Sequence, residues 1–297
     1  MISEEKLFQA LMGKPITPWP FQQKVSAALA NERNVLLWAP TGAGKTWAAL
    51  LGFLHGWVNR QPHSDRVIYA LPLRSLATSL YKSTLEAVVK AKNSDLLSQD
   101  EKKRLGDLTI TIQTGERKED PFFRGSICFA TIDQVLTGYL NIPASLPPRL
   151  ANINTGALIG SLVVVDEIHL FEPTQSLATL LEIERRFHGL TKFLLMSATL
   201  SDYSMRTLQD SMSAEFIEVS KEELALMPSQ RDKKRKLEWV DEPLEVSHII
   251  KNHKGGRSLV ICNTVERAQN LFEELSRIKS QADDFTVMLL HSRFFQS

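Results

Sequence analysis

A short glycine-rich segment has the residue types and the spacing that phosphate binding requires. Residues 39–46 read Ala-Pro-Thr-Gly-Ala-Gly-Lys-Thr, between an apolar run at 35–38 and a stretch at 46–58 typical of a helix. Glycines allow successive N–H groups to converge on a phosphate, while the lysine reaches the outer phosphates and the threonine hydroxyl suits Mg²⁺. Although the strict pattern begins with Gly rather than Ala39, we predict a nucleotide-binding loop that comprises Thr41, Gly42, Ala43, Gly44, Lys45 and Thr46.

Two carboxylates follow a second apolar run. Asp166 and Glu167 come directly after Leu162–Val165. Hydrolysis of a nucleoside triphosphate requires a carboxylate that holds Mg²⁺ and a second group that polarises the attacking water. Alone, such a pair is equally typical of a solvated turn. Together with the phosphate loop, it predicts an ATP hydrolysis site that uses Mg²⁺.

The elements that must position these residues form an α/β pattern. Continuous apolar runs, separated by helical or turn-like segments, are typical of parallel strands that helices cover on both faces. We therefore predict a doubly wound parallel sheet with the phosphate loop at the carboxyl end of its first strand. Beyond 35–38, the expected strands are 66–71, 108–113, 127–130, 162–165, 193–196 and 216–219.

Composition limits the class of protein. The 297 residues are 43% hydrophobic and 23% charged, which is typical of a globular chain, and the net charge of +1 neither favours nor excludes nucleic acid. No apolar run approaches the roughly 20 residues that cross a bilayer. Residues 1–11 have no apolar signal core, so we expect a cytoplasmic protein. Cys128 and Cys262 are far apart and lie in apolar runs, which predicts buried thiols.

With these motifs in order, the chain resembles a superfamily 2 helicase of the P-loop NTPase, RecA-like class. The segment Asp166-Glu167-Ile168-His169 resembles the magnesium-binding motif of that family. The resemblance implies a site role for His169, an adenine contact for Gln22, and coupling of hydrolysis to nucleic-acid binding by Ser197 and Thr199. On its residues alone, Gln22 is equally an ordinary surface glutamine. The implied nucleic-acid contacts are Pro72, Arg74, Thr114, Gly115, Thr131, Asn263 and Thr264.

The chain is more specifically similar to the signature CRISPR-associated helicases of type I interference systems. The similarity is carried by segments 129–136, 149–152, 166–171 and 289–294. It implies a prokaryotic protein of antiviral defence that uses ATP and Mg²⁺ to translocate 3′ to 5′ on single-stranded DNA. It also implies recruitment by a guide-RNA surveillance complex that has opened an R-loop.

The expected domain organisation is an ATP-binding RecA-like domain over 1–225 with a short helical lead-in, a linker over 226–245, and the start of a second RecA-like domain over 246–297. In the second domain we expect strands at 258–262 and 286–290 around a helix at 263–278. The basic run 230–236 is expected to be a solvated linker face.

Two departures from the family pattern lead to further expectations. We expect the second domain to be incomplete, and therefore ATP and Mg²⁺ to bind but hydrolysis to be poor and unwinding absent, unless another chain supplies the remainder. The sequence also contains no His-Asp doublet, so the resemblance implies that a separate HD-type nuclease cuts the DNA.

Two alternative functions remain open at this stage. The first is a superfamily 2 helicase of another branch, which acts on RNA or in restriction or repair. The second is a non-catalytic ATP-binding subunit with a docking or regulatory role.

Overall fold

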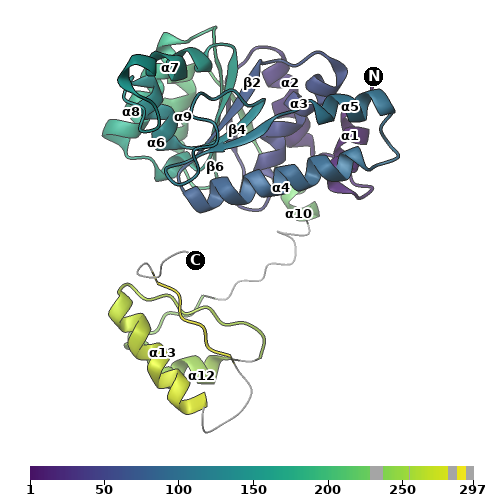
Figure 1. Ribbon diagram of the computed structural model, residues 1–297. Helices are drawn as coiled ribbons and strands as arrows, with labels where there is room; N and C mark the ends of the chain where they lie inside the picture. Colours follow the sequence, from purple (N-terminus) through teal and green to yellow (C-terminus); the bar gives the residue numbers. More distant parts are fainter. Residues whose placement is uncertain (228–236, 254, 280–285, 292–297) are drawn as a thin grey trace. The chain divides into compact units, whose positions relative to one another are not determined.

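The computed structural model describes residues 1–227, 237–253, 255–279 and 286–291. The chain divides into two compact units, residues 1–233 and 234–297 (Figure 1). Within the described residues, no helix is both long and apolar enough to cross a membrane.

The first unit is built on a seven-stranded sheet. Each neighbouring pair of strands is parallel, and the strand order is β3-β4-β2-β5-β6-β1-β7. The predicted doubly wound α/β class is therefore confirmed, and each predicted strand of this unit lies within two residues of an observed one. The strands are β1 Val35–Trp38, β2 Arg66–Leu71, β3 Ile110–Gln113, β4 Ile127–Thr131, β5 Ser161–Val165, β6 Lys192–Ser197 and β7 Glu215–Glu218.

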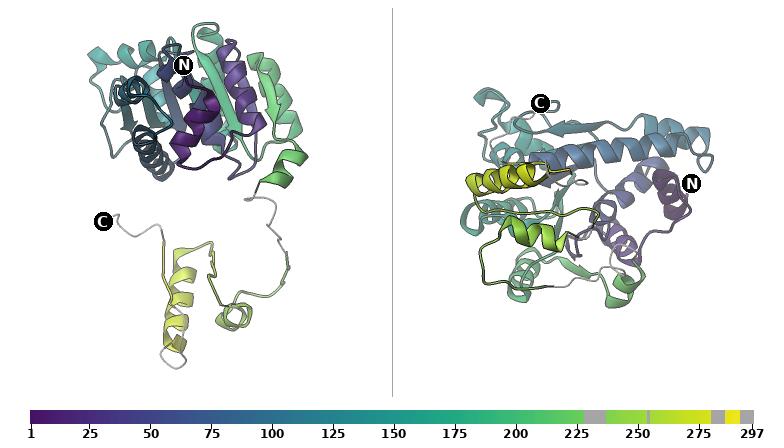
Figure 2. Two further views of the ribbon diagram at one scale, coloured as in Figure 1. Left: turned by 90° about the vertical axis from the view of Figure 1, so that its right-hand side faces the viewer. Right: turned by 90° about the horizontal axis from the view of Figure 1, so that it is seen from below.

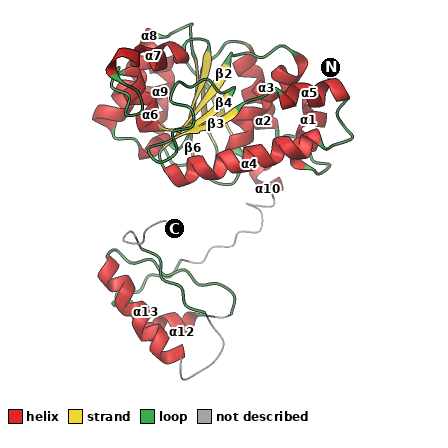
Figure 3. Ribbon diagram, viewed as in Figure 1, coloured by secondary structure: helices red, strands yellow, loops and turns green. Residues whose placement is uncertain are grey.

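Helices cover both faces of this sheet (Figures 2 and 3). Side chains alternate between the faces, so that Leu37 and Val164 pack into one apolar core and Leu36 and Val163 into the other. The first core is closed by α1 Glu4–Met12, α2 Pro20–Ala30, α3 Lys45–Asn59, α4 Arg74–Lys92 and α5 Gln99–Gly106. The second is closed by α6 Ile132–Tyr139, α7 Asn152–Leu158, α8 Ala178–Arg186 and α9 Asp202–Met212.

The strand order brings three chemically important loops together. Strand β6 pairs with β5 on one side and β1 on the other, with Leu195 opposite Val165 and Ser197 opposite Trp38. Parallel strands end at a common edge, so the loops that follow β1, β5 and β6 meet there.

The last helix of the first unit is hydrogen-bonded to α2. Helix α10, Lys221–Leu226, begins with a capping box in which Ser220 accepts from the Glu223 N–H. The buried carboxylate of Glu223 also accepts a hydrogen bond from the Phe21 N–H at 2.9 Å, although the two residues are 202 positions apart. The end of this unit therefore satisfies a backbone donor in the first turn of α2.

The second unit contains α12, Val246–Asn252, and α13, Val265–Lys279. Leu271 and Leu275 of α13 pack with Val246 in a small apolar core, against which Val260 and Val287 also lie. The strands predicted at 258–262 and 286–290 are wrong, because those described segments form no ladder of backbone hydrogen bonds. The basic run 230–236 and residues 292–294 lie outside the described residues.

Candidate nucleotide and nucleic-acid site

The glycine-rich loop turns sharply between β1 and α3. Gly42 has φ 83° and Gly44 has φ 97°, a left-handed conformation that a Cβ atom disfavours. Gly44 is the N-cap of α3, so Lys45 and Thr46 occupy the first turn, where backbone N–H groups point outwards. This is the local geometry that anion binding at a helix N-terminus requires.

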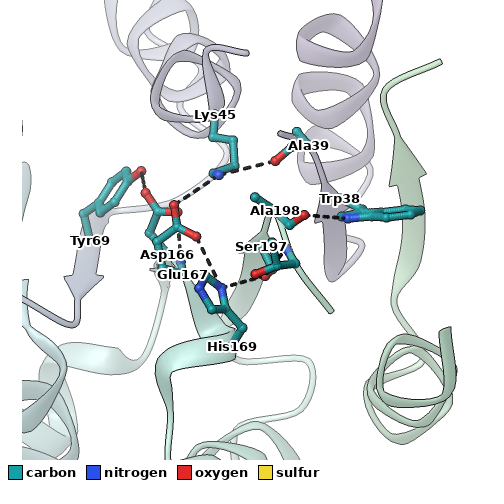
Figure 4. Close-up of polar contacts among 10 residues, drawn as sticks. Trp38, Ala39, Lys45, Tyr69, Asp166, Glu167, His169, Ser197 and Ala198 are labelled. Carbon is teal, nitrogen blue, oxygen red and sulfur yellow. Dashed lines mark hydrogen bonds and ion pairs between the residues drawn. The ribbon is translucent and has the colours of Figure 1, made fainter. Parts of the chain in front are cut away.

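Lys45 extends across the site and not into solvent. Only 7% of the residue is exposed, and its Nζ lies 3.3 Å from the Ala39 carbonyl oxygen and 3.2 Å from Glu167 Oε1. An ion pair between a buried lysine and a half-buried glutamate therefore joins the loop after β1 to the loop after β5, as the sheet order predicts (Figure 4).

Asp166 lies beside this pair, with its carboxylate fixed on both sides. Its Oδ2 accepts a hydrogen bond from the Tyr69 hydroxyl at 2.9 Å, and its Oδ1 accepts one from the Glu167 N–H at 2.9 Å. Burial raises the pKa of the Asp166 carboxyl above its usual range, an effect that the charge of Lys45 opposes.

Glu167 has an unusual backbone and an unsatisfied oxygen. Its φ of 53° is left-handed, and its Oε2 is buried without a hydrogen-bond partner among the residues that the structure describes. His169 Nδ1 lies 3.4 Å from this oxygen and 3.0 Å from Ser197 Oγ. Ser197 Oγ in turn accepts a hydrogen bond from the Thr199 N–H. A chain of contacts thus joins the loop after β5 to the loop after β6 (Figure 4).

The donor set at this edge fits Mg²⁺. Magnesium prefers oxygen ligands, and Thr46 and Asp166 supply a hydroxyl and a carboxylate. The Tyr69 hydroxyl holds the Asp166 carboxylate at the end of β5, and Thr46 lies beside Lys45 in the first turn of α3. The unsatisfied oxygen of Glu167 is a further acceptor at this edge, suited to a bound water.

Gln22 is not a surface residue. It is 1% exposed, its Oε1 accepts from the Trp19 N–H at 2.8 Å, and its Nε2 donates to the Gly44 carbonyl at 3.0 Å. A Cβ atom on Gly44 would come within 2.8 Å of that nitrogen. The alternative that Gln22 is an ordinary surface glutamine is therefore wrong. Its amide, which we predicted to contact adenine, is hydrogen-bonded to the phosphate loop in this structure.

The predicted nucleic-acid contacts of the first unit follow strands β2, β3 and β4. Arg74 is exposed at the start of α4, and its guanidinium pairs with Glu116 at 2.8 Å and packs against Gly115. Thr114 is buried, and its hydroxyl accepts from the Arg117 N–H. Pro72 is half-buried and Thr131 buried, so Arg74 and Gly115 are the accessible members of this group.

The two predicted contacts in the second unit lie at the start of α13. Asn263 and Thr264 are both exposed, and the Thr264 hydroxyl accepts a hydrogen bond from the Arg267 N–H. Their role in nucleic-acid binding stays a prediction.

Sequence reasoning missed Tyr69 and Glu223. Tyr69 lies within the apolar strand β2 and has the appearance of a core residue, yet its hydroxyl reaches Asp166. A polar-tipped aromatic in an otherwise aliphatic strand was the available signal. Glu223 gave no signal, because its partner lies 202 residues away.

Comparisons with known proteins identify the family that the chain matches. Residues 19–208 match the DEAD/DEAH box helicase family. A CRISPR-associated nuclease/helicase, Cas3, of Methanocaldococcus jannaschii is 28% identical over 95% of this chain and 38% of its own length. The Cas3 protein of Methanothermobacter thermautotrophicus is 27% identical over 93% of this chain and 33% of its own. The chain thus spans about a third of the length of these relatives.

A likeness to solved structures supports the fold. The helicase MrfA, described as a DUF1998 helicase, superposes with a TM-score of 0.62 over 94% of this chain and 41% of its own, at 16% identity.

Proposed function

Because this chain belongs to the DEAD/DEAH box helicase family, we propose that it is the ATP-hydrolysing part of a CRISPR-associated DNA helicase. The observation that carries the proposal is the convergence of Lys45, Asp166 and Glu167 at one edge of the sheet, with Lys45 Nζ 3.2 Å from Glu167 Oε1. These three side chains are the ones that phosphoryl transfer to water requires.

Each residue of the site has a defined task in this proposal. The N–H groups at the start of α3 bind the phosphates, and Lys45 neutralises the outer ones. Thr46 and Asp166 would hold Mg²⁺, which would supply positive charge against the charge that develops on the phosphates. Glu167 accepts a proton from the attacking water through Oε2, which accepts no hydrogen bond from the described residues and lies 3.4 Å from His169 Nδ1.

The contact chain through His169 supports a link between hydrolysis and nucleic-acid binding. His169 lies between Glu167 and Ser197, and Ser197 begins the Ser-Ala-Thr segment that follows β6. A conformational change in that segment when a nucleic-acid strand binds would therefore alter the contacts of Glu167, the proposed base. The proposed ligand is single-stranded DNA, held through its phosphates by Arg74 and the exposed loop at Gly115.

The names of the two archaeal relatives support the CRISPR assignment. We propose that the DNA is the displaced strand of an R-loop that a guide-RNA surveillance complex has opened, and that the protein acts in the prokaryotic cytoplasm.

The test measures phosphate release from ATP by this chain, alone and with single-stranded DNA, duplex DNA or single-stranded RNA of matched length. We expect Mg²⁺-dependent turnover that single-stranded DNA stimulates most and that Glu167→Gln abolishes. Stronger stimulation by RNA would contradict the CRISPR assignment. Tight ATP binding with no turnover under any condition would favour the non-catalytic docking subunit.

A further inference from the structure

The phenol of Tyr69 contacts the proposed site through Asp166, although no motif includes it. Tyr69 is fully buried in β2, between β4 and β5, and its hydroxyl donates to Asp166 Oδ2 at 2.9 Å (Figure 4). The other oxygen of Asp166 accepts from the Glu167 N–H. Two donors, one from each side, therefore fix the rotation of this carboxylate.

The register of the sheet brings this phenol to the carboxylate. Strand β2 pairs with β5, and Tyr69 lies opposite Val164, two residues before Asp166. The ring itself is held by the core, where it packs on Phe129 with 5.3 Å between centroids.

The chemistry of the donor also suits a cation site. A phenol stabilises a carboxylate through a hydrogen bond without adding a positive charge. A lysine or arginine at this place would stabilise the carboxylate equally well but would repel Mg²⁺. A carboxylate ligand that is itself hydrogen-bonded is a recurrent feature of metal sites, because the outer partner fixes the direction of the ligand.

We propose that Tyr69 is a positioning residue for the Mg²⁺ site, which holds the Asp166 carboxylate in the orientation that receives the metal. The inference rests on the proposed ATP-hydrolysing function and adds to it a residue that touches neither nucleotide nor metal. The proposal predicts different effects on two properties of the site. Nucleotide binding by the phosphate loop does not require Tyr69, whereas the increase in nucleotide affinity that Mg²⁺ causes does require it.

The experiment uses the full chain with Tyr69→Phe, which keeps the ring and removes only the hydroxyl. Binding of a fluorescent ATP analogue is measured first in EDTA and then during titration with Mg²⁺. We expect the variant to bind the analogue in EDTA with the affinity of the wild type. The Mg²⁺ concentration that gives half of the increase in affinity should be roughly 10-fold higher for the variant. Tyr139→Phe, at a half-buried tyrosine that packs on Phe187, is the matched control and should titrate as the wild type does.

The result separates the inference from the function on which it rests. If the wild type binds no nucleotide, the proposed function fails. If the wild type gains affinity with Mg²⁺ and Tyr69→Phe gains as much at the same concentrations, only the inference is overturned. In an Asp166→Asn background, Tyr69→Phe should cause no additional shift, because the phenol acts through that carboxylate.

A second measurement does not depend on the folding of the Tyr69 variant. The chain has four tyrosines, so a variant with Phe at 81, 139 and 203 keeps Tyr69 as its only phenol. Its ultraviolet difference spectrum should change when Mg²⁺ is added to the nucleotide complex. A spectrum that does not respond to Mg²⁺ would overturn the positioning role.

Discussion

The Nζ atom of Lys45 lies 3.2 Å from Oε1 of Glu167, with the lysine side chain buried and the glutamate side chain 20% exposed. In the proposed function, the lysine neutralises the carboxylate until phosphate oxygens compete for it. The two residues therefore have separable roles, one in binding and one in hydrolysis.

Replacement of these residues should separate the two steps. Glu167→Gln keeps the size of the side chain and removes the charge, so ATP binding should be retained while the hydrolysis rate falls by about 10²–10⁴-fold. Lys45→Ala should lose ATP binding itself, because it removes the charge that reaches the outer phosphates. Nucleotide affinity and phosphate release are measured on both variants, and equal loss of affinity in both would contradict separate roles.

Ser197→Ala should weaken the response to DNA more than it weakens basal turnover. The Ser197 hydroxyl contacts His169 Nδ1 at 3.0 Å and accepts from the Thr199 N–H, so its removal breaks the contact chain between the loops after β5 and β6. Stimulation of ATP turnover by single-stranded DNA is the measurement. Ser211→Ala, on the exposed side of α9, is the control and should be stimulated as the wild type is.

Glu223→Ala should destabilise the first unit by about 1–3 kcal/mol, because the N–H groups of Phe21 and Ser220 lose their acceptor. Urea unfolding measures the change in free energy. The neighbouring Glu222 is exposed on the same helix, and Glu222→Ala should change stability by much less. Equal changes in the free energy of unfolding for the two substitutions would show that the hydrogen bonds of Glu223 do not stabilise the first unit.

Acid should destabilise the first unit through His63. Burial, together with the charge of Lys192, lowers the pKa of His63 from 6.5 to about 4. The unfolded chain binds this proton more readily than the folded chain does. The contribution of neutral His63 to the free energy of unfolding is therefore fully present above pH 6.5. It is lost as the pH falls towards 4, and the total loss is on the order of 3 kcal/mol. His63→Asn should flatten the stability profile over this interval.

A control for the acid effect lies on the same edge of the sheet. His188 has a 67% exposed side chain beside Glu184, and His188→Asn should not flatten the profile. Thermal unfolding between pH 4 and 7 measures both variants, and identical slopes for the wild type and His63→Asn would contradict the prediction.

Much of the first unit was predictable because the sequence signals for its strands and motifs lie within short stretches of the chain. Continuous apolar runs mark strands that are buried on both faces, and the chemical motifs lie immediately after them. Once the sheet is parallel, its edge places the loop at Lys45 near Asp166 without any knowledge of side-chain contacts.

The parts that escaped prediction depend on pairings distant in sequence. The bond of Tyr69 to Asp166 arises only when β2 and β5 are neighbours. The burial of Gln22 follows from the packing of α2 against α3, which turns the amide towards Gly44. At 258–262 the composition favours a strand, but a strand also requires a hydrogen-bonded neighbour, which composition does not supply.

The left-handed backbone of Glu167 has a consequence for protein engineering. Such a conformation costs a residue with a Cβ atom about 1 kcal/mol, and glycine or asparagine adopts it more readily. A redesign that ranks residues by thermostability alone would therefore favour removal of the glutamate. Under the proposed function the more stable protein would no longer hydrolyse ATP, because this left-handed position carries the carboxylate proposed to activate the attacking water.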